Sequence, residues 1–126
     1  MKRNYELKMR KSSFMGRIPV TNNFREFEDE EVDEIIRRLE MMVKAWADKE
    51  NLNVSGKKEK ERHSLNVEFF EVKNSNIVIE FVHGYSWAVN IYLKYDSANE
   101  NLISELDYYL KNLENKIDGL DIDIDP

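Results

Sequence analysis

Residues 65–120 read LNVEFFEVKNSNIVIEFVHGYSWAVNIYLKYDSANENLISELDYYLKNLENKIDGL, and this stretch decides the fold. Three segments at 63–72, 76–82 and 86–95 alternate apolar and polar residues with the period of two that is typical of half-buried strands. The segment at 98–118 changes to the period of an amphipathic helix. The stretch therefore predicts an antiparallel meander of three strands followed by a helix.

The lengths of the two loops predict which side chains share a face of this sheet. We expect three-residue loops at 73–75 and 83–85, and Gly84 can adopt the positive φ that a short hairpin loop uses. Loops with an odd number of residues collect the apolar side chains on one face, whereas two-residue loops scatter them over both. The predicted core face is Leu65, Val67, Phe69, Ile77, Ile79, Phe81, Trp87, Val89, Ile91 and Leu93.

The opposite, outer face is more apolar than a water-exposed face needs to be. Apolar patches larger than a few hundred Å² usually mark an interface or a ligand groove. Three explanations stay open: the N-terminal segment covers this face, a second copy of the chain covers it, or a partner or ligand binds there. The predicted outer face carries Phe70, Val72, Val78, Val82, Ala88 and Tyr92, mixed with Asn66, Glu68, Glu80, Ser86 and Asn90.

A second amphipathic helix is predicted at 29–50, ahead of the strands. Its first turn is acidic, which suits the helix dipole. Ser97 and Glu100 form a capping-box pattern at the start of the later helix, and Gly119 provides its stop. Each helix has one apolar stripe, so we expect both to pack on one face of the sheet. The predicted fold is α+β, with an antiparallel sheet of three to four strands, two helices on one face, and the order β-α-β-β-β-α.

The rest of the chain is assigned to the same single domain, 1–126. The basic segment 1–23 alternates Tyr5, Leu7 and Met9 and is predicted to form an edge strand. The polar stretch 51–62 is predicted to be a flexible exposed loop. The acidic end, 119–126, is either a short edge strand or a frayed tail.

Composition excludes several classes of site and of protein. The 126 residues contain no cysteine, which rules out disulfides and thiolate metal sites. Apolar residues make up 41% and charged residues 35%, with a net charge of −6. We find no apolar run of membrane-spanning length and no secretory signal, so we expect a cytoplasmic protein.

Candidate catalytic and metal-binding chemistry is sparse. The two histidines, His63 and His83, lack any metal-ligand spacing and are interpreted as ordinary surface residues. Four isolated glycines exclude a glycine-rich phosphate cradle, and no nucleophile motif is present. We therefore expect no cofactor, no metal and no catalytic residue, and the sequence favours a non-enzymatic role over catalysis.

The order α-β-β-β-α over residues 29–118 is similar to that of the double-stranded RNA-binding domain. The resemblance implies that a basic cluster at the start of the second helix would grip phosphates. Here that helix begins Ser97-Ala98-Asn99-Glu100-Asn101 and continues with acidic residues. The charge has the wrong sign, so nucleic-acid binding through that surface is not expected.

Two functional hypotheses follow. In the first, the chain is a small acidic binding protein of the inhibitor, immunity or phage anti-defence type, which occludes a protein partner or sequesters a ligand. An acidic surface can be steered onto a basic channel of such a partner. The residues expected to face the partner are Glu28, Asp29, Glu30 and Glu31.

In the second, the chain binds a nucleotide or another small ligand at the outer sheet face or at a homodimer interface through that face, with weak hydrolase activity left open. Arginines would meet phosphate and an aromatic ring would stack on the ligand. The predicted binding residues are Phe70, Val82, Tyr92, Asn90, Arg10, Arg17 and Arg62.

Overall fold

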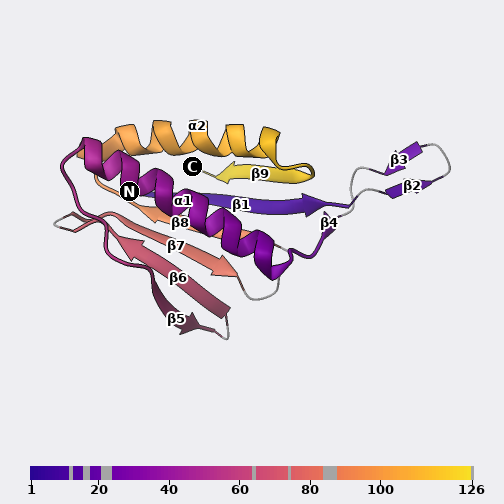
Figure 1. The fold of residues 1–126 in the computed structure, drawn as a ribbon, viewed down its shortest axis with the longest axis horizontal. Coiled ribbons are helices and arrows are strands. Elements are labelled where there is room, and N and C mark those ends of the chain that lie inside the picture. The colour runs from indigo at the N-terminus through magenta and orange to yellow at the C-terminus, as the bar shows by residue number, and fades with distance from the viewer. Residues whose placement is uncertain are drawn as a thin grey trace.

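The computed structural model describes residues 1–11, 13–15, 18–20, 24–63, 65–73, 75–83 and 88–125. It is an α+β fold built on a large antiparallel sheet with two α-helices (Figure 1). The elements are β1 (Lys2–Arg10), β2 (Ser13–Met15), β3 (Ile18–Val20), β4 (Phe24–Arg25), α1 (Asp29–Lys49), β5 (Lys58–Arg62), β6 (Leu65–Glu71), β7 (Val78–His83), β8 (Val89–Lys94), a 3-10 turn η1 (Ser97–Asn99), α2 (Glu100–Lys116) and β9 (Leu120–Asp125).

The sheet has seven strands in the order β4-β1-β8-β7-β6-β5, and β9 also pairs with β1. β8 and β9 both pair with β1 across Asn4 to Leu7, so they lie on its two opposite edges. A separate hairpin, β2-β3, leads from β1 toward β4 (Figure 1). The predicted sheet of three to four strands was therefore too small, although the fold class was right.

Three segments outside the predicted three-stranded meander form strands of the sheet. β1 is a strand, as expected, but it is an interior strand because β8 and β9 flank it. β9 resolves the open question about the C-terminal segment in favour of an edge strand. The predicted loop at 51–62 is wrong in its second half, because Lys58–Arg62 forms β5 and pairs with β6.

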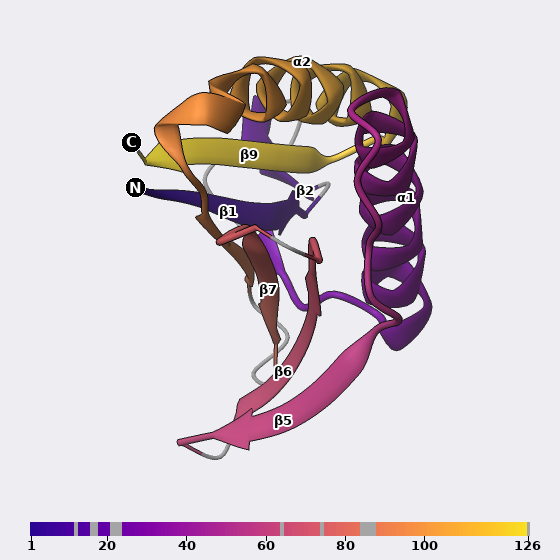
Figure 2. The same cartoon turned by 90° about the vertical axis from the view of Figure 1, so that its left-hand side faces the viewer.

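Both helices lie on the same side of the curved sheet (Figure 2), as expected. Their apolar stripes and the facing side of the sheet form one core, with Trp46 of α1, Leu106 of α2 and Phe81 of β7 all 0–1% exposed. Tyr5, Leu7 and Met9 of β1 belong to the same core. The apolar residues that alternate along β1 are therefore the ones buried between the sheet and the helices.

The predicted register between β6 and β7 was wrong by one residue. Phe70, not Phe69, is paired with Ile79. The cause is the length of the turn, because Val72 N–H donates to Ile77 O across four intervening residues, 73–76, rather than three. Since side chains alternate along a strand, this one residue moves every side chain of β6 to the opposite face.

The predicted register between β7 and β8 was wrong by four residues. A shift by an even number leaves each side chain on its predicted face of the sheet but gives it a different partner on the neighbouring strand. Phe81 is paired with Ile91, and Val82 with Asn90. The connection is therefore longer than the predicted three-residue loop at 83–85. The predicted place of Trp87 in the core lies outside the described residues.

The predicted helix ends are partly right. α1 begins at Asp29 behind a capping box in which Glu28 and Glu31 exchange side-chain and backbone hydrogen bonds. α2 does not use the predicted box of Ser97 and Glu100, because Ser97 opens a 3-10 turn and makes no capping bond. Gly119 has φ +86°, and a Cβ there would lie 3.2 Å from the carbonyl oxygen of Arg10, so glycine is required at this turn.

β5 forms one edge of the sheet, and all five of its residues are exposed. Its sequence, KEKER, places basic side chains on one face and acidic side chains on the other. The resemblance to the double-stranded RNA-binding domain does not extend beyond element order, because β1, β5 and β9 enlarge the sheet on both sides. Among the described residues, neither helix is both long and apolar enough to cross a bilayer.

Candidate functional site

The outer face of the sheet is the side that neither helix covers (Figure 2). Residues that pair directly across strands lie on the same face, so the pairing fixes its composition. One row of paired residues crosses most of the sheet on this face. It runs from β1 to β5 through Asn4, Tyr92, Glu80, Phe69 and Lys58.

A hollow of about 400 Å³ lies over β1, β8, β7 and the start of β6, and we call it the outer-face hollow. Its volume is at the lower end of the range for small-molecule sites. It combines basic side chains with an aromatic ring and one carboxylate. It is lined by Lys2, Asn4, Arg62, His63, Leu65, Glu80, Val82, Tyr92, Leu93 and Lys94.

Two lysines stand directly opposite each other at one end of the outer-face hollow. Lys2 and Lys94 are paired in the β1–β8 ladder, and both are exposed. Like charges in directly opposed positions repel each other, because their Cβ atoms lie only about 5 Å apart. Neither lysine has an ion-pair partner among the described residues. An anion bound between them would relieve this repulsion.

Glu80 is the one carboxylate of the outer-face hollow and is only 6% exposed. Lys60 Nζ lies 2.9 Å and Arg62 Nη2 3.4 Å from its Oε2, close enough for ion pairs although no directed hydrogen bond forms at that atom. Burial raises the pKa of Glu80, but Lys60, Arg62 and Lys94 outweigh it and bring the pKa below its ordinary value. Glu80 is therefore ionised at neutral pH.

Three of the predicted binding residues line the outer-face hollow: Val82, Tyr92 and Arg62. Asn90 lies on the same face, paired with Val82, but does not line the hollow. Val82, Asn90 and Tyr92 share this face because β7 and β8 keep the predicted faces in spite of their shifted register. Arg62 reaches the hollow from β5, which pairs with β6.

The other predicted binding residues do not join them. Phe70 was placed on the wrong face: it is fully buried in the core, with its ring centroid 5.6 Å from that of Phe81. Arg10 lies at the far end of β1, where its backbone N–H donates to Gly119 O. Arg17 lies outside the described residues.

Sequence reasoning missed Lys2, Lys94, His63 and Glu80 as members of one site. Lys2 joins the others through the pairing of β1 with β8, and the two strands are more than 80 residues apart in the chain. The available signal was the alternation in β1, which places Lys2 and Asn4 on the face opposite to Tyr5 and Leu7.

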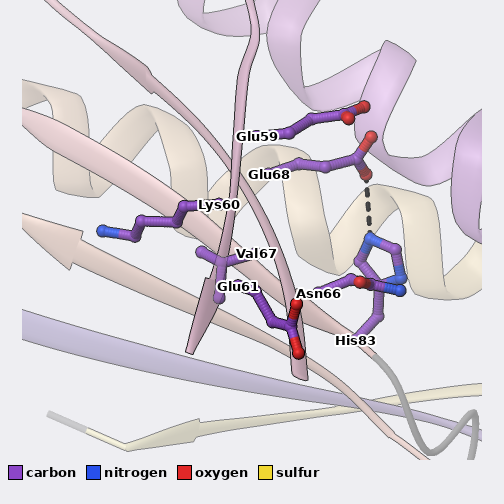
Figure 3. Close-up of a pocket in the computed structure, with 7 residues that line it drawn as sticks. All are labelled: Glu59, Lys60, Glu61, Asn66, Val67, Glu68 and His83. Carbon is purple, nitrogen blue, oxygen red and sulfur yellow. Dashed lines mark hydrogen bonds and ion pairs between the residues drawn. The ribbon is translucent and has the colours of Figure 1, made fainter. Parts of the chain in front are cut away.

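A second pocket, of about 360 Å³, lies on the helix side of the sheet near the β5 edge (Figure 3). Glu68 is 8% exposed and is bonded to His83 Nε2 at 2.9 Å and to Lys57 Nζ at 3.0 Å. Figure 3 shows Lys60 pointing away from Glu68 and His83. Burial raises the pKa of Glu68. The hydrogen bonds and charges of Lys57 and His83 together have the larger, opposite effect, so the pKa lies below its ordinary value.

Because the pKa of Glu68 is depressed in the fold, its ionised form stabilises the protein above about pH 4.5. This contribution is lost as the pH falls from there through the lowered pKa. We expect the melting temperature of the wild type to fall more steeply between pH 5 and about pH 3 than that of Glu68→Gln. Thermal unfolding followed by circular dichroism measures both slopes.

The matched control for this pH series is Glu26→Gln, which removes an exposed carboxylate. Its melting temperature should follow the wild-type curve. Equal slopes for Glu68→Gln and the wild type would show that the ion pairs of Glu68 do not stabilise the fold.

The two histidines are separated. His83 faces the second pocket, whereas His63 lines the outer-face hollow, so the pair cannot share a ligand. Among the described residues, no group of three or more His, Cys, Asp or Glu side chains is arranged to hold a metal ion.

The four acidic residues predicted to face a protein partner lie at the start of α1. Two of them make internal contacts: Glu28 and Glu31 form the capping box, and Glu31 also pairs with Arg25 at 2.7 Å. Asp29 and Glu30 are exposed. The quartet thus serves the helix start, and its role toward a partner stays a prediction.

No family model, curated protein or solved structure matches this chain.

Proposed function

We propose that the protein is a binding protein for a small phosphate-bearing ligand, which it holds in the outer-face hollow. The observation that supports this most directly is the opposed pair Lys2 and Lys94, two exposed cations side by side on the lining of the outer-face hollow. Arg62 adds a third cation to the lining, where its guanidinium lies 3.4 Å from the Glu80 carboxylate.

The rest of the hollow suits the remainder of such a ligand. Tyr92 presents a half-buried aromatic ring, and Leu65 and Val82 add apolar surface. A site with a few placed polar groups over apolar walls is the usual form of a small-molecule pocket. Between the two sequence-based hypotheses, this arrangement favours the ligand binder over the occluder of a protein partner.

The test is the affinity for pyrophosphate, measured by isothermal titration calorimetry at about 0.15 M ionic strength, where the Debye length is about 8 Å. The double variant Lys2→Gln/Lys94→Gln is expected to bind at least about 10-fold more weakly, because two charge-assisted contacts are lost. The same variant should be no less stable than the wild type, since it removes a repulsion between opposed lysines.

The matched control is Lys111→Gln/Lys116→Gln, which makes the same change in net charge at two exposed positions of α2. Its affinity should stay within about two-fold of the wild type, because exposed charges more than a Debye length from the ligand are largely screened. Equal losses in both double variants, or no binding by the wild type, would exclude the outer-face hollow as the site.

A further inference from the structure

We propose that Glu80 selects the ligand of this site: a nucleotide whose base carries an exocyclic amino group, stacked on Tyr92 and donating that amino group to the Glu80 carboxylate. This inference rests on the proposed function and specifies the chemical class of the ligand. It identifies a role for a buried acid in a hollow that is otherwise basic.

The positions of the two side chains come from the strand pairing. Glu80 of β7 lies directly opposite Tyr92 of β8, and both line the outer-face hollow. Side chains in directly opposed positions have Cβ atoms about 5 Å apart. A planar base lying on the Tyr92 ring therefore has an edge within reach of the carboxylate. Stacking on an aromatic ring holds a base of any type by its flat face, so Tyr92 fixes the position of the base and leaves its edge free for Glu80.

The chemistry of Glu80 favours an amino group over an oxo group. An ionised carboxylate only accepts hydrogen bonds. Its burial and its ion pairs with Lys60 and Arg62 keep it charged and in place. An amino group of cytosine or adenine can donate to it, whereas an oxo group at the same position would set two acceptors against each other.

Lys2 and Lys94 lie at a distance from Tyr92 and Glu80 that suits one nucleotide. Lys94 is two residues from Tyr92 along β8, and Lys2 is two residues from Asn4 along β1, so both lysines stand one side-chain row away. At about 3.3 Å per residue, that row is about 7 Å from the row of Tyr92 and Glu80. A ribose would span this interval, with the base at one end and the phosphate at the other.

The experiment compares two pairs of nucleotides that differ by amino against oxo: CMP with UMP, and AMP with IMP. We expect the wild type to bind the amino member of each pair at least about 10-fold more tightly in calorimetry, the size of effect expected for a charge-assisted hydrogen bond. In Glu80→Gln the preference should fall to within about three-fold, because a neutral amide offers both a donor and an acceptor.

The matched control is Glu68→Gln, which neutralises a carboxylate of similar burial and ion pairing on the opposite face of the sheet. Its preference should equal that of the wild type. Equal affinity of the wild type for both members of each pair would overturn the role of Glu80, even if Glu80→Gln failed to fold. If the wild type showed this equal affinity but still bound pyrophosphate, the proposed function would stand and only the role of Glu80 would fall. If the wild type bound neither the nucleotides nor pyrophosphate, both proposals would be refuted.

Discussion

Phe70→Ala is expected to lower the free energy of unfolding by about 3–5 kcal/mol, the usual cost of truncating a buried phenylalanine. Phe70 is fully buried and packs against Phe81 in the core. A loss of this size is a large part of the 5–15 kcal/mol that typically stabilises a domain. Chemical denaturation followed by fluorescence or circular dichroism measures it.

The neighbouring substitution provides the control, because Phe69 lies on the outer face and is only half-buried. Phe69→Ala should cost less than half as much as Phe70→Ala, since less apolar area is lost from the interior. The register predicted from the sequence places Phe69 in the core and reverses this order. A larger effect at Phe69 would therefore show that β6 pairs with β7 in the other register.

Asp107→Ala is expected to have the second largest effect, a loss of about 2–4 kcal/mol. Asp107 of α2 accepts hydrogen bonds from the hydroxyl of Tyr5, at 2.6 Å, and from the guanidinium of Arg3. Tyr5 is fully buried, and Arg3 is largely shielded from solvent. Removal of the carboxylate leaves the buried Tyr5 hydroxyl without its acceptor, and leaves Arg3 with the Tyr5 oxygen, at 3.1 Å from its Nε, in place of a carboxylate.

A double-mutant cycle of Asp107→Ala with Tyr5→Phe isolates the contact between α2 and β1. We expect a coupling energy of at least about 1 kcal/mol from equilibrium denaturation. Glu105→Ala is the matched control, because Glu105 also joins α2 to another element through its ion pair with the exposed Lys49. Its loss should be within about 1 kcal/mol, as for other surface ion pairs. A similar loss at Glu105 would assign the effect to α2 itself.

The helices could be predicted from sequence because their signal is local. The apolar stripe of α1 gave its bounds to within a residue, and Gly119 marked the turn after α2. The strands β6, β7 and β8 were also found from alternation. Their register was not, because it depends on turn geometry: Ser75 Oγ bonds the backbone of Val72 and Ile77 and stabilises a four-residue turn.

In the candidate site too, the features that depend on local sequence could be predicted and those that depend on strand pairing could not. Val82 and Tyr92 were placed on the outer face because alternation within β7 and β8 is independent of their partners. Lys2 and Lys94 could not be brought together, since nothing local to either strand indicates that β1 inserts beside β8. Long-range strand pairing is decided by the whole core, and a period of two is common to every possible partner.

The β5 edge has a consequence for self-association. If two copies met edge to edge about a two-fold axis perpendicular to the sheet, residues on the same face would stand opposite each other. Lys58, Lys60 and Arg62 would then face only cations, and Glu59 and Glu61 only carboxylates. Strand alternation and charge alternation thus have the same period, which makes every in-phase alignment of this edge with itself repulsive. The charges of β5 therefore oppose the antiparallel pairing of this edge with a second copy, a step from which a fibril could grow.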